Sequence, residues 1–414
     1  LDAARQYYNG RAGWEQLKRF SFIWQQPDGF WRLHKTMRDT LRVRAGSHAA
    51  AVHEWFFTHW TERAERSLAW FHRWTLDPKG TAEGWETQHE AALREGRVPD
   101  ARALLSDWAD VSLDDGDRRW LGDEVWATTL VRLGAAMWRT PLAPRQDAVT
   151  TAIHALHTAL DVFAAGGHAM PWALTLNHLG GAYAELPTGD REDNLRRAIA
   201  SFEAALRVWT EESFPQGWAE VQTNLGGVYS LLPTGDIEEN LRRAIACYEA
   251  ALRVHTEQGS PQGWAATQIN LGNAYQKLPT GDPGENLHRA IACYEAALRV
   301  STETALPAQW ALTQINLGSA YVNLPSWDRS ENLRRAIDCF EAALRVYTET
   351  DFPMGWADVQ VSLGNAYQKL PTGDPGANLQ RAIACYEAAL RTCTEIDFPL
   401  KWAAAQNNLG TVYT

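Results

Sequence analysis

Two pairs of histidines are the residues of this chain that most invite a metal-site interpretation. His53 and His59 flank Glu54, but a zinc helix of the His-Glu-x-x-His type has its histidines at positions i and i+4, and here they are six residues apart. His154 and His157 share a helix face, yet no carboxylate or cysteine is in step with them. Because neither pair has a complete ligand set, we expect no metal ion in this chain.

Five cysteines could form disulfide bonds or bind metal, but four of them occupy one slot of a repeated sequence. Each is followed by Tyr or Phe and then Glu, at Cys247, Cys293, Cys339 and Cys385. Equivalent Cα atoms on stacked helices lie ~8–10 Å apart, which is beyond disulfide reach. Cys393 follows Cys385 by two helical turns. We therefore expect reduced, buried thiols that serve packing.

Catalytic machinery is not recognisable in the sequence. A carboxylate recurs once per copy, which indicates a structural role, at Glu203, Glu249, Glu295, Glu341 and Glu387. The chain contains no Gly-x-x-x-x-Gly-Lys-Ser/Thr phosphate loop, and no nucleophile, base and orienting acid occur as a set. We expect a chain that is not an enzyme and binds no cofactor; any ATP-binding part of its parent protein would precede Leu1.

Charge and hydropathy argue against several classes of partner. The net charge is −11 and the pI about 5.6, so we expect neither nucleic acid nor an anionic membrane on the surface. No run of about 18 apolar residues occurs, and the start has no basic-then-apolar signal pattern. The sequence predicts a cytoplasmic location and a fragment of a longer protein.

A repeat of 46 residues organises the chain from residue 126 onward, and its elements must position any functional side chain. A Trp begins each obvious copy, at Trp172, Trp218, Trp264, Trp310, Trp356 and Trp402, and a Leu-Gly pair and a Tyr follow at fixed offsets. Trp126 and the Leu133-Gly134 pair lie one step earlier, so six full copies run from Trp126 to Lys401, with a half repeat at 402–414. A period of this length predicts a solenoid in which each unit contacts its neighbours.

Turn and cap residues predict two helices in the copy from Trp264 to Gln309. The first begins after Ser260-Pro261, with Ser as N-cap and Pro at the first helical position, and runs to about Lys277. It ends at Leu278-Pro279-Thr280-Gly281, because the residue before Pro leaves the α region and Gly permits a left-handed turn. The second helix begins at Asp282-Pro283-Gly284-Glu285, a capping-box arrangement.

The second helix of this copy carries an apolar stripe and a charge pair. Residues at steps of three and four predict the buried side, at Leu287, Ala290, Ile291, Tyr294, Ala297 and Leu298. Glu295 and Arg299 are spaced i,i+4 with Glu first, so we expect them to pair with each other at ~0.3 kcal/mol.

The motif Asn-Leu-Gly-Asn-Ala-Tyr followed by Ala-Ile-x-x-Tyr-x-x-Ala-Leu resembles the tetratricopeptide repeat (TPR), over residues 126–414. The usual unit of that family has 34 residues, and here both spacings between its motif residues are longer by six. The resemblance implies an all-α fold, a right-handed superhelical α-solenoid of helix hairpins, at residues 121–414. Long variants with Trp-Ala-x-x-Gln-x-Asn-Leu-Gly and Leu-Pro-Thr-Gly-Asp resemble repeats of bacterial STAND sensors, and also repeats that precede caspase-like CHAT proteases.

The segment before the array divides into two further parts. In residues 1–45, a short strand, a Pro-Asp-Gly turn, a second strand and a helix from near His34 predict a winged-helix-like segment. Phe30 to Leu41 resembles the module that closes the nucleotide-binding part of STAND (NB-ARC or NACHT type) ATPases; the alternative is a helical cap on the solenoid. Residues 46–120 are expected to be a helical linker or degenerate repeats, with two helices around Gly96-Arg97-Val98-Pro99 and a loop at Asp110 to Asp117.

Slots that vary among otherwise identical copies are the candidate binding positions. In TPR superhelices the first helix lines the concave groove, so the resemblance implies ligand-facing slots there; the alternative is that they vary because they are solvated. The candidate residues are Glu220, Thr223, Ser230, Ala266, Ile269, Asn273, Gln276, Lys277, Leu312, Ile315, Ser319, Val322, Asn323, Asp358, Val361, Asn365, Gln368 and Lys369. The repeated Trp is instead expected to pack.

Two functional hypotheses follow from the resemblance. The first is the protein-binding sensor region of a bacterial signalling or defence STAND-type protein, which recognises a protein trigger in the concave groove. The second is a static adaptor that positions a linked caspase-like (CHAT) protease or another effector. Extended grooves suit a protein or peptide ligand better than a small molecule. The half repeat also allows self-association through the solenoid ends.

Overall fold

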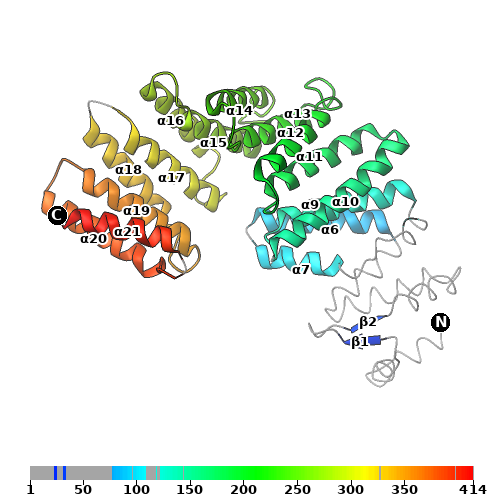
Figure 1. Cartoon of the computed structure of the whole chain (residues 1–414), viewed down its shortest axis with the longest axis horizontal. Coiled ribbons are helices and arrows are strands. Elements are labelled where there is room, and N and C mark those ends of the chain that lie inside the picture. The colour runs from blue at the N-terminus through cyan, green and yellow to red at the C-terminus, as the bar shows by residue number, and fades with distance from the viewer. Residues whose placement is uncertain are drawn as a thin grey trace. The chain divides into compact units, whose positions relative to one another are not determined.

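The computed structural model describes two strands at 23–25 and 31–33, and residues 77–413 apart from 96, 109–117, 119–121, 143, 326–327 and 397. The described residues form fifteen helices and these two strands, in two compact units of which the first ends at Pro187 and the second begins at Thr188 (Figure 1). The fold is all-α apart from the short hairpin, as the sequence predicts.

The hairpin consists of β1 (Ile23–Gln25) and β2 (Trp31–Leu33), which pair antiparallel with Ile23 opposite Leu33 and Gln25 opposite Trp31. This confirms the two predicted strands. The helix expected from near His34, the helices expected before residue 77 and the loop expected at Asp110 to Asp117 lie outside the described residues.

The first unit contains five described helices, which are α6 (Pro78–Arg94), α7 (Val98–Trp108), α9 (Asp123–Arg139), α10 (Arg145–Gly166) and α11 (Ala169–Glu185). The α6–α7 pair confirms the two helices predicted around residues 96–99, and the indole N–H of Trp85 on α6 donates to the Leu104 carbonyl of α7 at 2.8 Å. By length and composition α10 alone among the described helices could cross a membrane; here one face of it packs against α9 and α11.

The second unit alternates first and second helices of the repeat. First helices are α13 (Pro215–Tyr229), α15 (Pro261–Lys277), α17 (Pro307–Asn323), α19 (Pro353–Lys369) and α21 (Pro399–Val412). Second helices are α12 (Arg191–Ala205), α14 (Ile237–Ala251), α16 (Pro283–Leu298), α18 (Arg329–Ala343) and α20 (Pro375–Thr392). From α13 to α20 each first helix packs on its own second helix, and from α12 to α20 each second helix packs on the next first helix. The predicted order of elements is confirmed.

Helix ends in the repeat follow the predicted cap chemistry with two exceptions. Asp282 accepts from the backbone N–H groups of Gly284 (2.7 Å) and Glu285 (3.1 Å), and Gly281 has the left-handed φ of 85° that was expected. Glu285, however, accepts from Arg289, so it is not the reciprocal half of a capping box. Ser260 occupies the N-cap position of α15, but its buried hydroxyl makes no hydrogen bond to the helix.

The expected pair between Glu295 and Arg299 is wrong. Arg299 forms a two-point ion pair with Glu257, with both N–O distances at 3.0 Å, and Glu295 accepts from the Tyr321 hydroxyl of the following first helix at 2.9 Å. Both partners come from other elements of the stack, where the packed helices hold them in place. The i,i+4 geometry of an isolated helix therefore does not decide the pairing.

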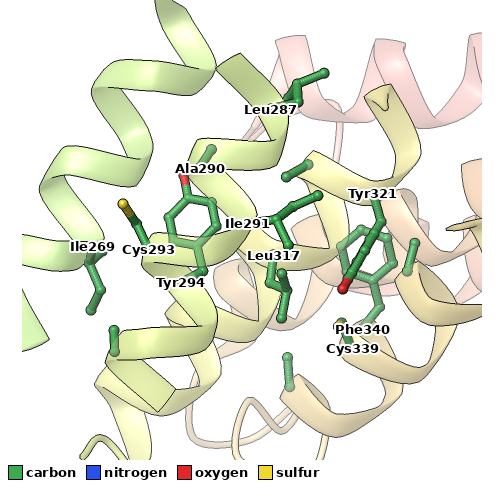
Figure 2. Packing of buried hydrophobic residues seen from close by; sticks show 14 of the residues in the cluster. Ile269, Leu287, Ala290, Ile291, Cys293, Tyr294, Leu317, Tyr321, Cys339 and Phe340 are labelled. Atoms are coloured by element: carbon green, nitrogen blue, oxygen red, sulfur yellow. The ribbon is translucent and has the colours of Figure 1, made fainter. Parts of the chain in front are cut away.

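In the four repeats from α13 to α20, the two helices meet where a glycine faces an aromatic ring; in the copy that starts at Trp126, Gly134 faces Leu156 instead. A Cβ on Gly272 would lie 2.7 Å from Tyr294, and one on Gly318 would lie 2.8 Å from Phe340, closer than real Cβ contacts allow. Figure 2 shows Tyr294 and Phe340 at equivalent places in neighbouring repeats, among the buried apolar residues. The ring occupies the space that any larger side chain would need, which explains the repeated Leu-Gly pair.

Adjacent glycines of α13 give a matched test of this contact. Gly226→Ala would place its Cβ 2.7 Å from the buried Tyr248 ring, whereas Gly227→Ala would meet only the Tyr248 hydroxyl oxygen at 3.9 Å. We expect Gly226→Ala to lower the free energy of unfolding by about 1–3 kcal/mol through overpacking, and Gly227→Ala to raise it by about 0.5–1 kcal/mol through helix propensity. Urea unfolding measures both, and equal effects of the two substitutions would contradict the contact.

Two buried histidines of the first unit are held neutral. Burial, and then the positive charge of nearby Arg139, lower the pKa of His89 to about 4 and that of His178 to about 3. Their exposed fractions are 2% and 8%, and His89 lies 2.9 Å from the Thr140 hydroxyl. Because the unfolded chain binds protons at an ordinary histidine pKa near 6.5, acid favours unfolding.

The first unit should therefore lose stability as the pH falls from about 6.5 toward 4. Each histidine adds up to about 1.4 kcal/mol per pH unit to the slope of the unfolding free energy against pH. Above the unfolded pKa of about 6.5 its effect no longer changes with pH. We expect His178→Gln to flatten the pH dependence, measured as urea unfolding of the full chain with hydrogen exchange to localise the change. His154→Gln, an exposed substitution on α10, is the control for the replacement itself.

Candidate protein-binding face

The first helices of the second unit share one side of the stack, because the first helices of neighbouring repeats also pack against one another. We call this side the inner face. It carries the slots 2, 5, 9, 12 and 13 positions after the Trp of α13, α15, α17 and α19, although some residues in these slots are buried. All eighteen predicted site residues belong to these slots.

A cavity of about 460 Å³ lies between α15, α17 and the start of α16, at the edge of the inner face. It brings together five of the predicted residues, which are Asn273, Gln276, Lys277, Ser319 and Asn323. The lining also includes Asn316 and Asn286, which the sequence comparison missed because both belong to repeated motifs and so were interpreted as packing residues. The cavity is open and rich in side-chain amides, which suits backbone groups of an extended chain better than an enclosed small molecule.

Amide side chains on this face bind a tyrosine beneath them. The Tyr294 hydroxyl lies 2.7 Å from Asn273 Oδ1 and 2.9 Å from Gln276 Oε1, and the Asn316 amide donates to Asn273 at 3.1 Å. The same arrangement recurs two repeats later around Tyr386, where burial raises the tyrosine pKa to about 12.

The repeat between these two amide clusters lacks the corresponding Asn and Gln pair. Its second helix carries Phe340, which has no hydroxyl to satisfy, and its first helix carries Ser319 and Val322 where the neighbours have Asn and Gln. The Ser319 hydroxyl donates to the Ile315 carbonyl of its own helix. On α15, α17 and α19 the residues in these two slots therefore match the aromatic residue beneath them, whereas on α13 Gly227 and Ser230 lie next to Tyr248.

An apolar stripe runs along α17 on the inner face. Leu312 is 45% exposed, and Ile315 and Val322 are half-buried against the core. Val361 on the neighbouring α19 is half-buried in the same way. These side chains leave part of their apolar surface in water, where a ligand could cover it.

Charged groups on the inner face are few. Lys277 and Lys369 are exposed at the ends of α15 and α19, in equivalent slots. Asp358 is ion-paired with Lys401 at 2.6 Å, and Glu220 on α13 is exposed. The predicted site residue Asp358 is thus already engaged within the array.

Several other predicted site residues serve the fold. Ile269 is only 6% exposed and lies in the core, so its inclusion among the ligand-facing residues was wrong. Thr223 donates to the Ala219 carbonyl and lies 3.1 Å from the Thr267 hydroxyl, and Ser230 donates to the Gly227 carbonyl. Ala266 is half-buried and presents only a methyl group. An apolar residue in a varied slot cannot be assigned to solvent or core without the tertiary contacts.

The repeated Trp lies on another side of the stack and packs, as the sequence predicts. Trp264 is 9% exposed, and the Arg299 guanidinium lies 5.2 Å from its ring centroid, within cation–π range. The same guanidinium pairs with Glu257. Equivalent Arg–Trp–Glu sets recur at Arg253, Arg345 and Arg391.

The repeated cysteines and carboxylates also occupy packing positions. All five cysteines are free thiols, and burial raises the pKa of Cys293 and Cys385 to about 11, which leaves them protonated and poorly nucleophilic. The repeated glutamates from Glu203 to Glu341 each accept from the tyrosine hydroxyl of the next first helix. In the part of the chain that the structure describes, no three His, Cys, Asp or Glu side chains are grouped to hold a metal ion.

These features define an α-solenoid of TPR-like helix hairpins with an open inner face. The chain is similar to the crystal structure of the apo form of RapI, with 12% identity and a TM-score of 0.51 over 80% of this chain and 82% of that one. It is also similar to a tetratricopeptide repeat protein from Parabacteroides merdae ATCC 43184, with 14% identity and a TM-score of 0.41 over 80% of this chain and 99% of that one. No family model and no curated protein matches the sequence.

The match between the aromatic residue and the amides can be tested by introducing the tyrosine, and then the amides, into the repeat that has Phe340. Phe340→Tyr should lower the free energy of unfolding by about 1–3 kcal/mol, because its hydroxyl would be buried beside Ser319 and Val322 without the amide partners of Tyr294. Adding Ser319→Asn and Val322→Gln should recover most of that loss. Urea unfolding of the single and triple variants measures this, and a triple variant no more stable than Phe340→Tyr would contradict the match.

Proposed function

We propose that the inner face of the second unit binds an extended segment of another protein. One observation carries the proposal. The repeated residues are engaged in contacts within the stack, whereas the inner face keeps partly exposed apolar side chains beside amides and exposed lysines that form no ion pair with any described residue. A surface of this kind offers apolar contact to alternate side chains and hydrogen bonds to a peptide backbone.

An extended peptide fits this face better than the other ligand classes. The cavity at α15 and α17 is open and the apolar stripe continues beyond it onto α19, so the surface is longer than a small molecule would use. The chain has a net charge of −11, and its inner face carries acidic as well as basic groups, which disfavours nucleic acid.

We further propose that the array is the sensor region of a STAND-type signalling or defence protein, with the bound segment as its trigger. This context is supported by the sequence resemblance of residues 30–41 and of the long repeats, and the alternative context is an adaptor beside a caspase-like protease. The coding sequence on both sides of this chain distinguishes them. A phosphate loop upstream supports the sensor, and a His/Cys protease downstream without that loop contradicts it.

Selection from a displayed random peptide library on the immobilised full chain tests the binding face. We expect peptides of micromolar affinity whose binding is lost when Leu312→Arg crowds the inner face, since that side chain is exposed and its replacement should not unfold the array. Gln380→Arg, an exposed substitution on the second helix α20, is the matched control and should leave binding unchanged. Failure to enrich any peptide, or binding that survives Leu312→Arg, would contradict the proposal.

A further inference from the structure

The lysines of the second unit are confined to first helices. They are Lys277, Lys369 and Lys401, and every other cationic side chain from Thr188 onward is an Arg or His outside these helices. Lys401 is ion-paired with Asp358. Among the described residues, neither Lys277 nor Lys369 forms an ion pair, so two exposed ammonium groups on the inner face are available to a ligand.

Lys277 and Lys369 belong to two equivalent polar clusters. Lys277 lines the α15–α17 cavity together with Asn273 and Gln276, and Lys369 follows Asn365 and Gln368 in the same slots two repeats later. In both clusters a tyrosine hydroxyl holds the amides from below. The two clusters therefore offer the same chemistry, which is a cation beside oriented amides.

Between the clusters, α17 provides apolar contact on the inner face and has no charged side chain. Asn323 occupies the slot equivalent to the two lysines, Val322 precedes it, and Leu312 and Ile315 continue the apolar stripe of α17. Along the stack, the inner face thus presents a cation, an apolar patch and a second cation in successive repeats.

We propose that this pattern selects an extended acidic peptide in which two carboxylate side chains flank apolar ones, the carboxylates at Lys277 and Lys369 and the apolar side chains on α17. The inference rests on the binding function proposed above and names its ligand class. Neighbouring packed helices lie ~8–10 Å apart, so the two lysine-bearing helices are separated by roughly 16–20 Å. An extended chain rises ~3.3 Å per residue, which sets the two carboxylates about five to six residues apart.

Side-chain alternation fixes the design of the peptide further. In an extended chain, residues at even spacing point to one side, so the acidic and apolar residues must share one parity. The sequence Glu-Ser-Leu-Ser-Leu-Ser-Glu meets this condition. The sequence Glu-Leu-Ser-Ser-Ser-Leu-Glu has the same composition and charge, but its leucines point away from its glutamates.

The test measures the affinity of the full chain for each of these two peptides by fluorescence anisotropy. Each peptide is labelled and flanked by Gly-Ser. The first peptide should bind at least about 5-fold more tightly than the second, because only the first places two leucines against the apolar stripe. Replacing both glutamates by Gln, or combining Lys277→Gln with Lys369→Gln, should weaken the first peptide by about 5- to 20-fold, as expected for two solvent-exposed charge pairs. Its affinity should also fall as salt is raised.

Lys79→Gln is the control for loss of a cation, since Lys79 is exposed on α6 in the first unit. It should leave the affinity unchanged, and thermal unfolding should show every variant folded. Equal binding of the two peptides, or full affinity in the double lysine variant, would overturn the inference. If the designed peptides fail in this way but library-selected peptides still lose binding with Leu312→Arg, the proposed binding face stands and only its ligand class is wrong. If the library-selected peptides keep binding, the binding face and the ligand class are both wrong.

Discussion

The close approach of a glycine to an aromatic ring is the contact on which the repeat array depends. At Gly226, Gly272, Gly318 and Gly364, a Cβ atom would come within 2.7–2.8 Å of the ring on the paired second helix. The helices can meet at this distance only because one side contributes no side chain, and the ring fills the space instead. The buried stripes, the Tyr–Glu bonds and the loop geometry all rely on the helix separation that this contact sets.

Electrostatic contacts then join each repeat to the next. An arginine at the end of each second helix from α14 to α20 lies over the Trp of its own repeat and pairs with a glutamate in the loop before that Trp. A tyrosine on each first helix from α13 to α19 donates a hydrogen bond to a glutamate on the previous second helix. These groups are exposed or half-exposed, so each pair alone contributes little. Their repetition orients neighbouring hairpins and removes the repeated residues from the set available for recognition.

On the inner face, which is the proposed binding face, two kinds of variation overlap. In the slots of Asn273 and Gln276 on α15, α17 and α19, amides occur where a tyrosine lies beneath and are absent where a phenylalanine does. This variation serves a hydrogen bond within the fold. Leu312, Lys277 and Lys369 satisfy no such requirement, because their outer atoms reach solvent and no described residue pairs with the lysines. Positions such as Leu312, Lys277 and Lys369 are therefore the better guide to a ligand. The structure is needed to distinguish them from positions that vary to suit the residue beneath.

The sequence by itself determined the period, the all-helical hairpins, the caps at Asp282 and Gly281 and the buried stripe through Tyr294. These features depend on residues a few positions apart, or on a period that repetition makes visible. The tertiary structure decided that Arg299 pairs with Glu257, 42 residues away, and not with Glu295. It also placed Ile269 in the core and gathered Asn316, Asn273 and Lys277 around one cavity. Such contacts depend on how neighbouring hairpins stack, and spacing along one helix does not specify that geometry.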